Sequence, residues 1–459
     1  MMKSGNNKHR WLFILAGLPA LLFAQVTIAQ VNDTAKITRH EFSIQQAVDY
    51  AKKNNINVKN ALLDISIQEQ TNREYTAAAY PQISGSSSYT ANIKMPPTIF
   101  PNSLFMPGTT GYTKGPAFGF KYSASAGLEL NQILFDGQVF VGLQARKTAL
   151  EFQQKNAEIT EETIKANIYK IYYQLVVSKK QIELLDANID RVEKLLHDTK
   201  EIYKAGFAEQ LDIDKVSVGL TNLQTEKTRA LNQIVNGYLG LKTLMGMPVE
   251  EVLILTDTLN ETEIKMAALD AGSFNYANRK EYQYANLGIK LNEYNIRRYK
   301  LSKIPTLSMN AYYNKVSQSP NFNLSGGFSF PVSAVALRLN VPIFTGFATN
   351  SKIQKAKLEL EKSQNQRTAL ELSINNEIET AKNNFNSAIS SMDYQRRNME
   401  VAEKVYYQTK KKYEMGTGSQ TEINTAQTDL KAAQTNYIQA LYDAIIARVD
   451  FLKATGKLD

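Results

Sequence analysis

FGFKYSASAGLELNQILFDG, residues 118–137, decides the fold because it joins two structural patterns. Over 118–131 apolar and polar side chains alternate with a period of two, which predicts a strand between lipid and a wet lumen. The LFDG motif at 134–137 then leads into a long helical pattern. The predicted apolar face consists of Phe118, Phe120, Tyr122, Ala124, Ala126, Leu128 and Leu130.

Three further segments show the same alternation and predict strands over residues 82–93, 306–315 and 333–341. The segments between paired strands, 94–117 and 316–332, are rich in Pro, Gly and Asn. Such residues favour turns, so both segments are predicted to be exposed loops.

Long helical hairpins are predicted over residues 138–246 and 347–456. The first helix of each hairpin covers about 65 residues, which makes a rod on the order of 100 Å long. Most of each rod contains neither Gly nor Pro, so nothing in the sequence forces a break. Shorter helices are expected before the strands, over 43–79 with a break near Asn54-Asn55 and over 267–302 with a break near Arg279.

The sequence repeats itself at an offset of about 210 residues. YKAG at 203–206 returns as YEMG at 413–416, and LFDG returns as IFTG at 343–346. An apolar seam with alternating spacings of four and three, typical of a coiled coil, recurs in the same phase. We therefore predict an internal duplication, with a first repeat over 30–266 and a second over 267–459. The first seam consists of Ile164, Ile168, Ile171, Leu175, Ser178, Ile182, Leu185, Ile189, Val192, Leu196, Thr199 and Tyr203.

Residues 1–29 have the pattern of a secretory signal peptide, with a basic start, an apolar run from Trp11 to Phe23 and a small residue at Ala29. The apolar run is too short to span a bilayer, which takes about 20 residues. We expect an exported protein that is cleaved after Ala29. No later segment reads as a membrane-spanning helix, so any membrane insertion is expected to use strands.

The 459-residue chain has no Cys and only three His, which excludes disulfides, Cys/His zinc sites and cysteine nucleophiles. We therefore predict no enzyme activity, no cofactor and no metal site. The formal net charge of +9 is spread along the predicted helices and indicates solvated helix faces, so nucleic acid is not an expected partner.

Four strands cannot close a barrel, and open strand edges cannot lie in hydrocarbon because their backbone groups would lack hydrogen bonds. Several chains must therefore share one barrel. Two chains would give eight strands and a filled interior, whereas three would give twelve strands and leave a lumen. Passage of substrates favours three chains, with the helices continuing the barrel as an α-helical tube through the periplasm.

The order, spacing and duplication of the LFDG and YKAG motifs resemble the outer membrane efflux proteins, the TolC-like family. The resemblance covers nearly all of the predicted mature chain. It implies an α+β membrane protein: a homotrimer with a twelve-stranded outer-membrane β-barrel and a periplasmic α-barrel. It further implies a tip that opens when a periplasmic adaptor (membrane fusion) protein and an inner-membrane pump of RND or ABC type dock.

The same resemblance implies a periplasmic gate of Asp212, Tyr413 and Glu422. Glu422 matches a carboxylate that narrows the entrance, while Thr425 stands where some members carry a second acid. Asp212 and Tyr413 match a pair that links hairpins in the closed state, and Gly418 replaces an arginine that adds a link. An alternative is that Asp212 and Glu422 are acids that favour the start of a helix.

The hairpin turns are expected to be the surface on which the adaptor docks. Their glycines also suit the left-handed conformation that ends helices, and this role alone would explain them. The predicted docking residues are Ala205, Gly206, Phe207, Met415, Gly416 and Thr417.

The predicted function is that of the exit channel of a tripartite efflux system, which passively conducts small molecules or drugs. A conduit for type I protein secretion is the alternative, and the sequence does not separate the two. A coiled-coil scaffold without transport is the third reading. The alternating strands argue against a scaffold, which has no use for lipid-facing side chains.

Overall fold

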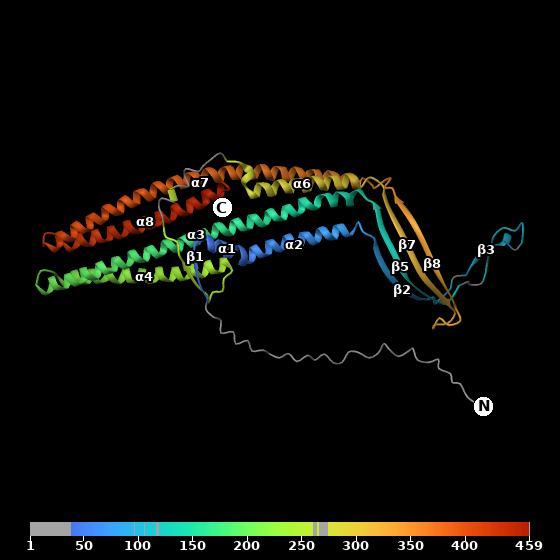
Figure 1. Ribbon diagram of the computed structural model, residues 1–459, viewed down its shortest axis with the longest axis horizontal. Coiled ribbons are helices and arrows are strands. Elements are labelled where there is room, and N and C mark those ends of the chain that lie inside the picture. The colour runs from blue at the N-terminus through green and yellow to red at the C-terminus, as the bar shows by residue number, and fades with distance from the viewer. Residues whose placement is uncertain are drawn as a thin grey trace, which may run out of the picture. The chain divides into compact units, whose positions relative to one another are not determined.

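The computed structural model describes residues 38–95, 97–104, 106–115, 119–259, 264–265 and 274–458. The predicted signal peptide lies outside the described residues. From Arg39 onward the chain forms one unit. This unit contains a four-stranded sheet and two long helical hairpins (Figure 1).

The sheet consists of β2 (Gln82–Ala91), β5 (Tyr122–Phe135), β7 (Thr306–Ser319) and β8 (Phe328–Asn340). The strands follow the order β2-β5-β7-β8, and every neighbouring pair is antiparallel. The two repeats meet where β5 pairs with β7. Strands β2 and β8 are the open edges of the sheet.

The register places the predicted apolar side chains of all four strands on one face. Directly opposed residues project to the same side of a sheet, and successive residues alternate between sides. The prediction of one apolar and one polar face is thereby confirmed. The opposed apolar pairs are Ile83 with Leu130, Leu128 with Tyr313, Ala311 with Val335, Met309 with Leu337, and Leu307 with Leu339.

Several predicted strand ends were wrong, most of all in β5 and around the loop between β7 and β8. The strand predicted over 118–131 runs over 122–135, because pairing with β7 extends from Tyr122 to Phe135 through a bulge; Phe118 lies outside the described residues. The loop predicted over 316–332 is reduced to 320–327, since both neighbouring strands continue into it. Pro331 lies within β8, where an edge strand tolerates a residue without a backbone N–H.

The loop predicted over 94–117 contains short elements of its own. Strand β3 (Ile99–Pro101) leads into the 3-10 helix η1 (Asn102–Leu104) and pairs with β4 (Tyr112–Lys114) in antiparallel fashion. A second small sheet, which the sequence analysis did not predict, joins β1 (Arg39–Phe42) to β6 (Val252–Leu255) in parallel.

The long hairpins agree with the prediction to within three residues at each end. The first consists of α3 (Gly137–Lys204) and α4 (Gln210–Met245), and the second of α7 (Ala348–Glu414) and α8 (Gln420–Ala454). Every residue of the first predicted seam is buried or half-buried except Tyr203, which is 42% exposed. The coiled-coil seam therefore directs the packing of α3 from Ile164 to Thr199, in the part of the helix that leads to the turn.

The shorter helices also break near the predicted positions. Asn55 separates α1 (Ile44–Asn54) from α2 (Ile56–Ala77): its Oδ1 accepts from the Asn57 N–H at 2.8 Å, and its Nδ2 donates to the Leu244 carbonyl at 2.6 Å. In the second repeat, Arg279 separates the 3-10 helix η2 (Tyr276–Asn278) from α6 (Lys280–Leu301). The part of this prediction at 267–273 lies outside the described residues.

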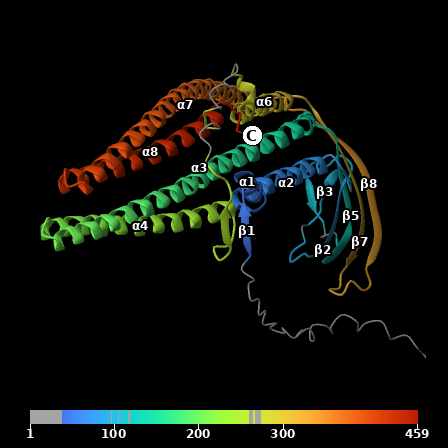
Figure 2. The ribbon, with the colours of Figure 1, turned by 60° about the vertical axis from the view of Figure 1, so that its left-hand side comes forward.

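Helices α2, α3, α6 and α7 pack side by side in that order, which repeats the order of the strands to which they connect (Figure 2). Beyond the ends of α2 and α6, the layer continues as α4, α3, α8 and α7. Helices α2, α4 and α7 thus form its edges. None of the helices in the described residues is both long and apolar enough to cross a bilayer.

Arg279 is a buried cation that joins three helices at the break before α6. Only 4% of its side chain is exposed, and its Nη1 donates to the Ala454 carbonyl at 2.7 Å. Its guanidinium also contacts the carboxylates of Glu281 at 3.1 Å and Glu377 at 3.0 Å. Burial acts to raise the pKa of Glu281, but its hydrogen bonds and the positive charges of Arg279 and Lys453 together outweigh burial, so this pKa lies below its usual value.

We expect Arg279→Ala to lower the free energy of unfolding by about 2–4 kcal/mol, because it leaves a buried carbonyl and two carboxylates unpaired. Urea unfolding followed by helical circular dichroism measures this change. Arg39→Ala is the control, since its ion pair with Glu41 is exposed and worth about 0–1 kcal/mol. Equal stability of both variants would contradict the assigned role of Arg279.

A pH dependence accompanies this ion-pair cluster. Because the pKa of Glu281 is lower in the folded chain than in the unfolded chain, its stabilising contribution is present above the unfolded pKa. The contribution is lost as the pH falls through the folded pKa. Acid unfolding should therefore be less steep in Arg279→Ala than in the parent chain.

Candidate periplasmic gate and docking turns

The two hairpin turns lie at the end of the helices that is remote from the sheet (Figure 1). The first turn, 205–209, joins α3 to α4, and the second, 415–419, joins α7 to α8. Both views place the two turns at the same end of the helical layer (Figure 2). A partner that approaches this end would meet both turns.

Gly206 and Gly416 end the long helices in the left-handed conformation, with φ of 84° and 73°, as predicted. Their N–H groups donate to the carbonyls of Tyr203 at 2.9 Å and Tyr413 at 3.0 Å. A Cβ atom at either glycine would meet no atom within 4 Å. The backbone conformation, and not crowding, is therefore what favours glycine here.

The predicted docking residues form an exposed and partly apolar surface. Phe207 is 86% exposed and Met415 is 62% exposed, while Ala205 is also exposed. Thr417 is exposed too, although its Oγ1 donates to the Lys412 carbonyl at 3.1 Å. Exposed aromatic and thioether side chains suit contact with another protein. Docking itself stays a prediction.

Asp212 and Glu422 each belong to a capping box at the start of a helix. Asp212 Oδ2 accepts from the Glu209 N–H at 3.2 Å, and Glu422 Oε2 accepts from the Ser419 N–H at 3.4 Å. In return, the Glu422 N–H donates to Ser419 Oγ at 3.2 Å. The helix-start role thus has its geometry within one chain. A gate role depends on neighbouring chains and stays a prediction.

Tyr413 is half-buried and packs against an apolar cluster shared by both hairpins. In the part of the chain that the structure describes, no hydrogen bond joins Tyr413 to Asp212. Any bond between these two residues would therefore form between neighbouring chains. The cluster consists of Leu185, Val192, Leu195, Val216, Leu223, Ala230, Tyr406, Ile423, Ala426 and Leu430.

A buried polar network, which the sequence analysis missed, also joins the hairpins. Asn188 is 2% exposed; its Nδ2 donates to Gln434 Oε1 at 2.8 Å. Its Oδ1 accepts from Gln427 Nε2 at 3.1 Å and from Arg191 Nη2 at 2.7 Å. A polar group on an apolar seam fixes the register of packed helices. The signal was Asn188 itself, three residues after Leu185 on the same helix face. Two ion pairs also join the hairpins, one between Lys431 and Glu226 and the other between Lys170 and Asp450.

The described residues contain no group of three or more His, Asp or Glu side chains that could hold a metal ion.

The sequence profile of the outer membrane efflux protein family matches residues 47–247 and 276–457. These two ranges contain all four strands of the large sheet and both long hairpins. The match therefore repeats along the chain in the same way as the duplication does.

Three relatives are about equally distant in sequence. The outer membrane protein TolC of Vibrio cholerae serotype O1 is 20% identical over 337 residues, which cover 73% of this chain and 77% of that protein. The outer membrane efflux protein BepC of Brucella suis biovar 1 is 20% identical over 413 residues, which cover 89% of this chain and 84% of that protein. The proteases secretion protein PrtF of Dickeya chrysanthemi is 21% identical over 253 residues, or 52% of each chain.

The fold is that of CusC, a protein whose solved structures concern transmembrane channel formation. The two structures agree with a TM-score of 0.71 over 90% of this chain and 92% of CusC, at 16% sequence identity. A likeness at this identity establishes the fold, while the profile match establishes the family. The chain belongs to the outer membrane efflux protein family, the TolC-like proteins, whose members lie in the outer membrane and extend into the periplasm.

Proposed function

We propose that the protein is the outer-membrane exit channel of a tripartite efflux system. It passively conducts small molecules or drugs from the periplasm, or from an inner-membrane pump, to the exterior. The observation that carries this proposal is the sheet register, which gives four strands one continuous apolar face and one polar face. A sheet of this kind suits lipid on one side and a wet lumen on the other.

The open edges support a homotrimer. Strands β2 and β8 have no further partner among the described residues, and three chains would give a barrel of twelve strands with a lumen. The edge helices also expose large apolar side chains. The exposed edge residues include Leu63 and Ile67 on α2, and Leu358 and Leu372 on α7.

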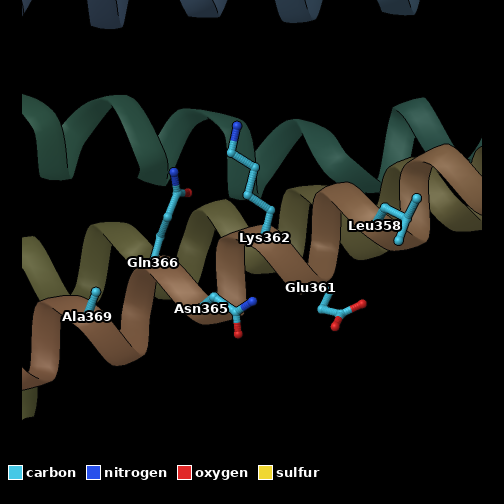
Figure 3. A pocket seen from close by; sticks show the side chains of 6 residues that line it. All are labelled: Leu358, Glu361, Lys362, Asn365, Gln366 and Ala369. Carbon is cyan, nitrogen blue, oxygen red and sulfur yellow. The ribbon is translucent and has the colours of Figure 1, made fainter.

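An open groove on α7 supports the same assembly. Its lining residues all come from this one helix, as expected for an edge helix that lacks its neighbour (Figure 3). A second copy of the chain would cover this groove when it extends the helical layer into a periplasmic α-barrel. The lining residues are Leu358, Glu361, Lys362, Asn365, Gln366 and Ala369.

The proposed partners are a periplasmic adaptor at the hairpin turns, an inner-membrane pump of RND or ABC type, and outer-membrane lipid. The pump supplies the energy, because the channel conducts passively. Type I protein secretion is the second candidate, and the relationship to PrtF favours it specifically. A coiled-coil scaffold that does not transport would not account for the apolar face of the sheet.

Reconstitution of the purified protein in planar bilayers tests the proposed function. We expect discrete conductance steps with the same conductance at either sign of a small applied voltage, as passive conduction requires. Absence of any conductance under conditions that open other members of the family would contradict the proposal. Deleting the gene should raise the accumulation of a fluorescent dye in cells. Unchanged accumulation together with loss of a secreted protein would favour type I secretion.

Glu422→Gln should weaken the cation preference of the channel and its block by divalent cations. A ring of three carboxylates creates a negative potential, and Gln removes the charge while keeping the capping box. Reversal potentials in a salt gradient measure the preference. Asp429→Asn, farther along α8, is the matched control and should have little effect. Equal selectivity of Glu422→Gln and the parent would return Glu422 to a helix-start role.

A further inference from the structure

Basic side chains are concentrated where the helices meet the sheet. The start of α3 (137–150), the end of α6 with the turn after it (294–305) and the start of α7 with the turn before it (346–358) lie at the same end of the sheet (Figure 1). These three segments contain two, four and three Lys or Arg residues, respectively, and no Asp or Glu. The corresponding end of α2 adds no net charge, because Arg73 is followed by Glu74. This end of the helical layer is therefore strongly basic.

The helix dipole explains only part of this pattern. Cations stabilise the C-terminal end of a helix, so Arg298 and Lys300 suit the last turn of α6. Helices α3 and α7 begin at this end of the layer, where the dipole favours acids, yet neither has an acid in its first turn. Asp136 lies just before α3 as its N-cap and accepts from the Gln138 N–H at 2.8 Å. Favourable helix ends thus do not account for the basic residues of α3 and α7.

A chain of contacts places Arg297 on the side of the helical layer that continues the apolar face of the sheet. Phe135 lies opposite Leu307 in the register of β5 and β7, and its ring lies 5.6 Å from that of Phe140 on α3. Gln144 follows Phe140 by one turn on the same face of α3. Its Oε1 accepts from Arg297 Nη1 at 3.0 Å. The Arg297 guanidinium therefore lies below the apolar face.

Arg297, Lys300 and Lys303 are exposed and form no ion pair with a carboxylate among the described residues. The hydrogen bonds of this group go to neutral amides, as from Lys303 Nζ to Asn350 Oδ1 at 2.7 Å. Cations bind phosphate oxygens through strong, charge-assisted hydrogen bonds. Their positive charge, which no acid of the same chain neutralises, suits an anion from outside the chain.

The depth of these residues matches that of phospholipid headgroups. Lys303 precedes β7 by three residues, and the apolar face of β7 begins at Leu307. Arg297 lies six residues before Lys303, which is about 9 Å at 1.5 Å per residue. The headgroup region extends about 5–8 Å beyond the hydrocarbon core, and Lys and Arg side chains are long enough to reach back toward it. With the apolar face in hydrocarbon, all three cations would reach the phosphate layer.

We propose that Arg297, Lys300 and Lys303 bind the phosphate groups of anionic phospholipids in the leaflet that faces the periplasm. A basic surface beside a membrane attracts anionic headgroups, and the attraction is screened by salt. This inference rests on the proposed function, because it needs the apolar sheet face to lie in the membrane. A lipid is favoured over an acidic polymer of the cell wall because the basic surface directly continues the apolar face. One bound lipid can thus place its phosphate on α6 and its acyl chains on the sheet.

Native mass spectrometry of the delipidated protein in a non-ionic detergent tests this inference. The probes are phosphatidylglycerol, which has a net negative charge, and phosphatidylcholine, which has none. We expect the parent protein to bind phosphatidylglycerol in preference. Arg297→Gln, Lys300→Gln and Lys303→Gln together should lower its binding by roughly tenfold or more at low salt. Lys300→Gln alone, which breaks no side-chain hydrogen bond or ion pair of the described residues, should lower it severalfold.

Two further variants separate the site from folding and from net charge. Arg297→Lys, Lys300→Arg and Lys303→Arg together keep the positive charges and should bind phosphatidylglycerol as the parent does. Lys404→Gln, Lys411→Gln and Lys412→Gln together remove the same charge from exposed positions near the far end of α7 and should leave binding unchanged. An equal loss in this remote variant would assign binding to net charge and overturn the proposed site.

Conductance distinguishes failure of this inference from failure of the proposed function. Equal binding of both lipids by a protein that conducts in planar bilayers would overturn the lipid site alone. Equal binding by a protein that does not conduct would overturn the proposed function as well. Purified peptidoglycan is the third probe. If the parent binds peptidoglycan, the variant with three Gln residues at the α6 site does not, and neither lipid is preferred, the basic surface belongs to the cell wall and the lipid site is wrong.

Discussion

Replacing Asp212 with Val and Tyr413 with Phe together is expected to raise the single-channel conductance severalfold in planar bilayers. The change removes a hydrogen bond that we propose between neighbouring hairpins of the closed tip. Each such bond to a charged acceptor contributes about 1.5–3 kcal/mol, so three copies contribute roughly 5–9 kcal/mol. Closure is therefore collective, and its loss should shift the channel strongly toward open states.

The structure dictates the controls for this experiment. Asp212 also accepts from the Glu209 N–H, so Asp212→Val weakens the start of α4. Tyr413→Phe alone leaves that cap intact and keeps the ring in its apolar cluster. Ser419→Ala removes a cap from α8 without touching the proposed bond. If Ser419→Ala opens the channel as much as the double variant, helix fraying and not a gate bond explains the effect. Unchanged conductance in the double variant would leave Asp212 as a helix-start acid.

Gly206→Asp or Gly416→Asp should abolish export in cells while the amount of assembled protein in the membrane stays near normal. An added Cβ meets no atom at either position, so only the left-handed backbone opposes the side chain, and Asp tolerates that conformation better than most residues do. The new carboxylate lies on the exposed turn, where it would disturb an approaching adaptor. Dye accumulation measures export, and immunoblotting of membrane fractions measures assembly.

Asparagine supplies the matched control at both glycines. Asn and Asp have the same shape and both tolerate the left-handed conformation better than other side chains, so they strain the backbone to a similar extent. Export retained by the Asn variants and lost in the Asp variants would assign the effect to charge at the docking surface. Equal loss in both would assign it to the backbone or to bulk, and full export in both would remove the docking claim.

The helical part of the fold could be predicted because its signals are local. The heptad seam and the glycines at 206 and 416 need only neighbouring residues to act, and α3, α4, α7 and α8 begin and end close to the predicted residues. Tyr203 is the exception within the first seam, since it lies beside the turn and remains 42% exposed. A seam loses its packing partners where the helix reverses.

Strand ends depend on pairing between distant segments, which alternation alone does not reveal. The strand containing Phe135 extends because β7 supplies hydrogen bonds to it from the other repeat. Residues 328–332 looked like loop because of Pro331, but β8 is an edge strand and tolerates that residue. The apolar face was nevertheless predicted correctly, because a period of two fixes the face independently of where a strand ends.

The role of the candidate gate residues could not be predicted from the sequence, for a different reason. Asp212 and Glu422 have clear local roles as helix-start acids, and the same carboxylates would also face a tip shared by three chains. The same residue pattern is therefore consistent with a helix-start role and with a gate role. The Asn188 network was missed because polar residues beside a seam usually face solvent, whereas here a second hairpin covers Asn188.

The mass of the membrane-extracted protein tests the central claim most directly. The account predicts that the chain fractionates with the outer membrane and that its complex in mild detergent has three times the mass of one mature chain by native mass spectrometry. Four strands with two open edges cannot close a barrel within one chain, and three chains are the number that we propose to leave a lumen. A stable, water-soluble monomer would contradict the account.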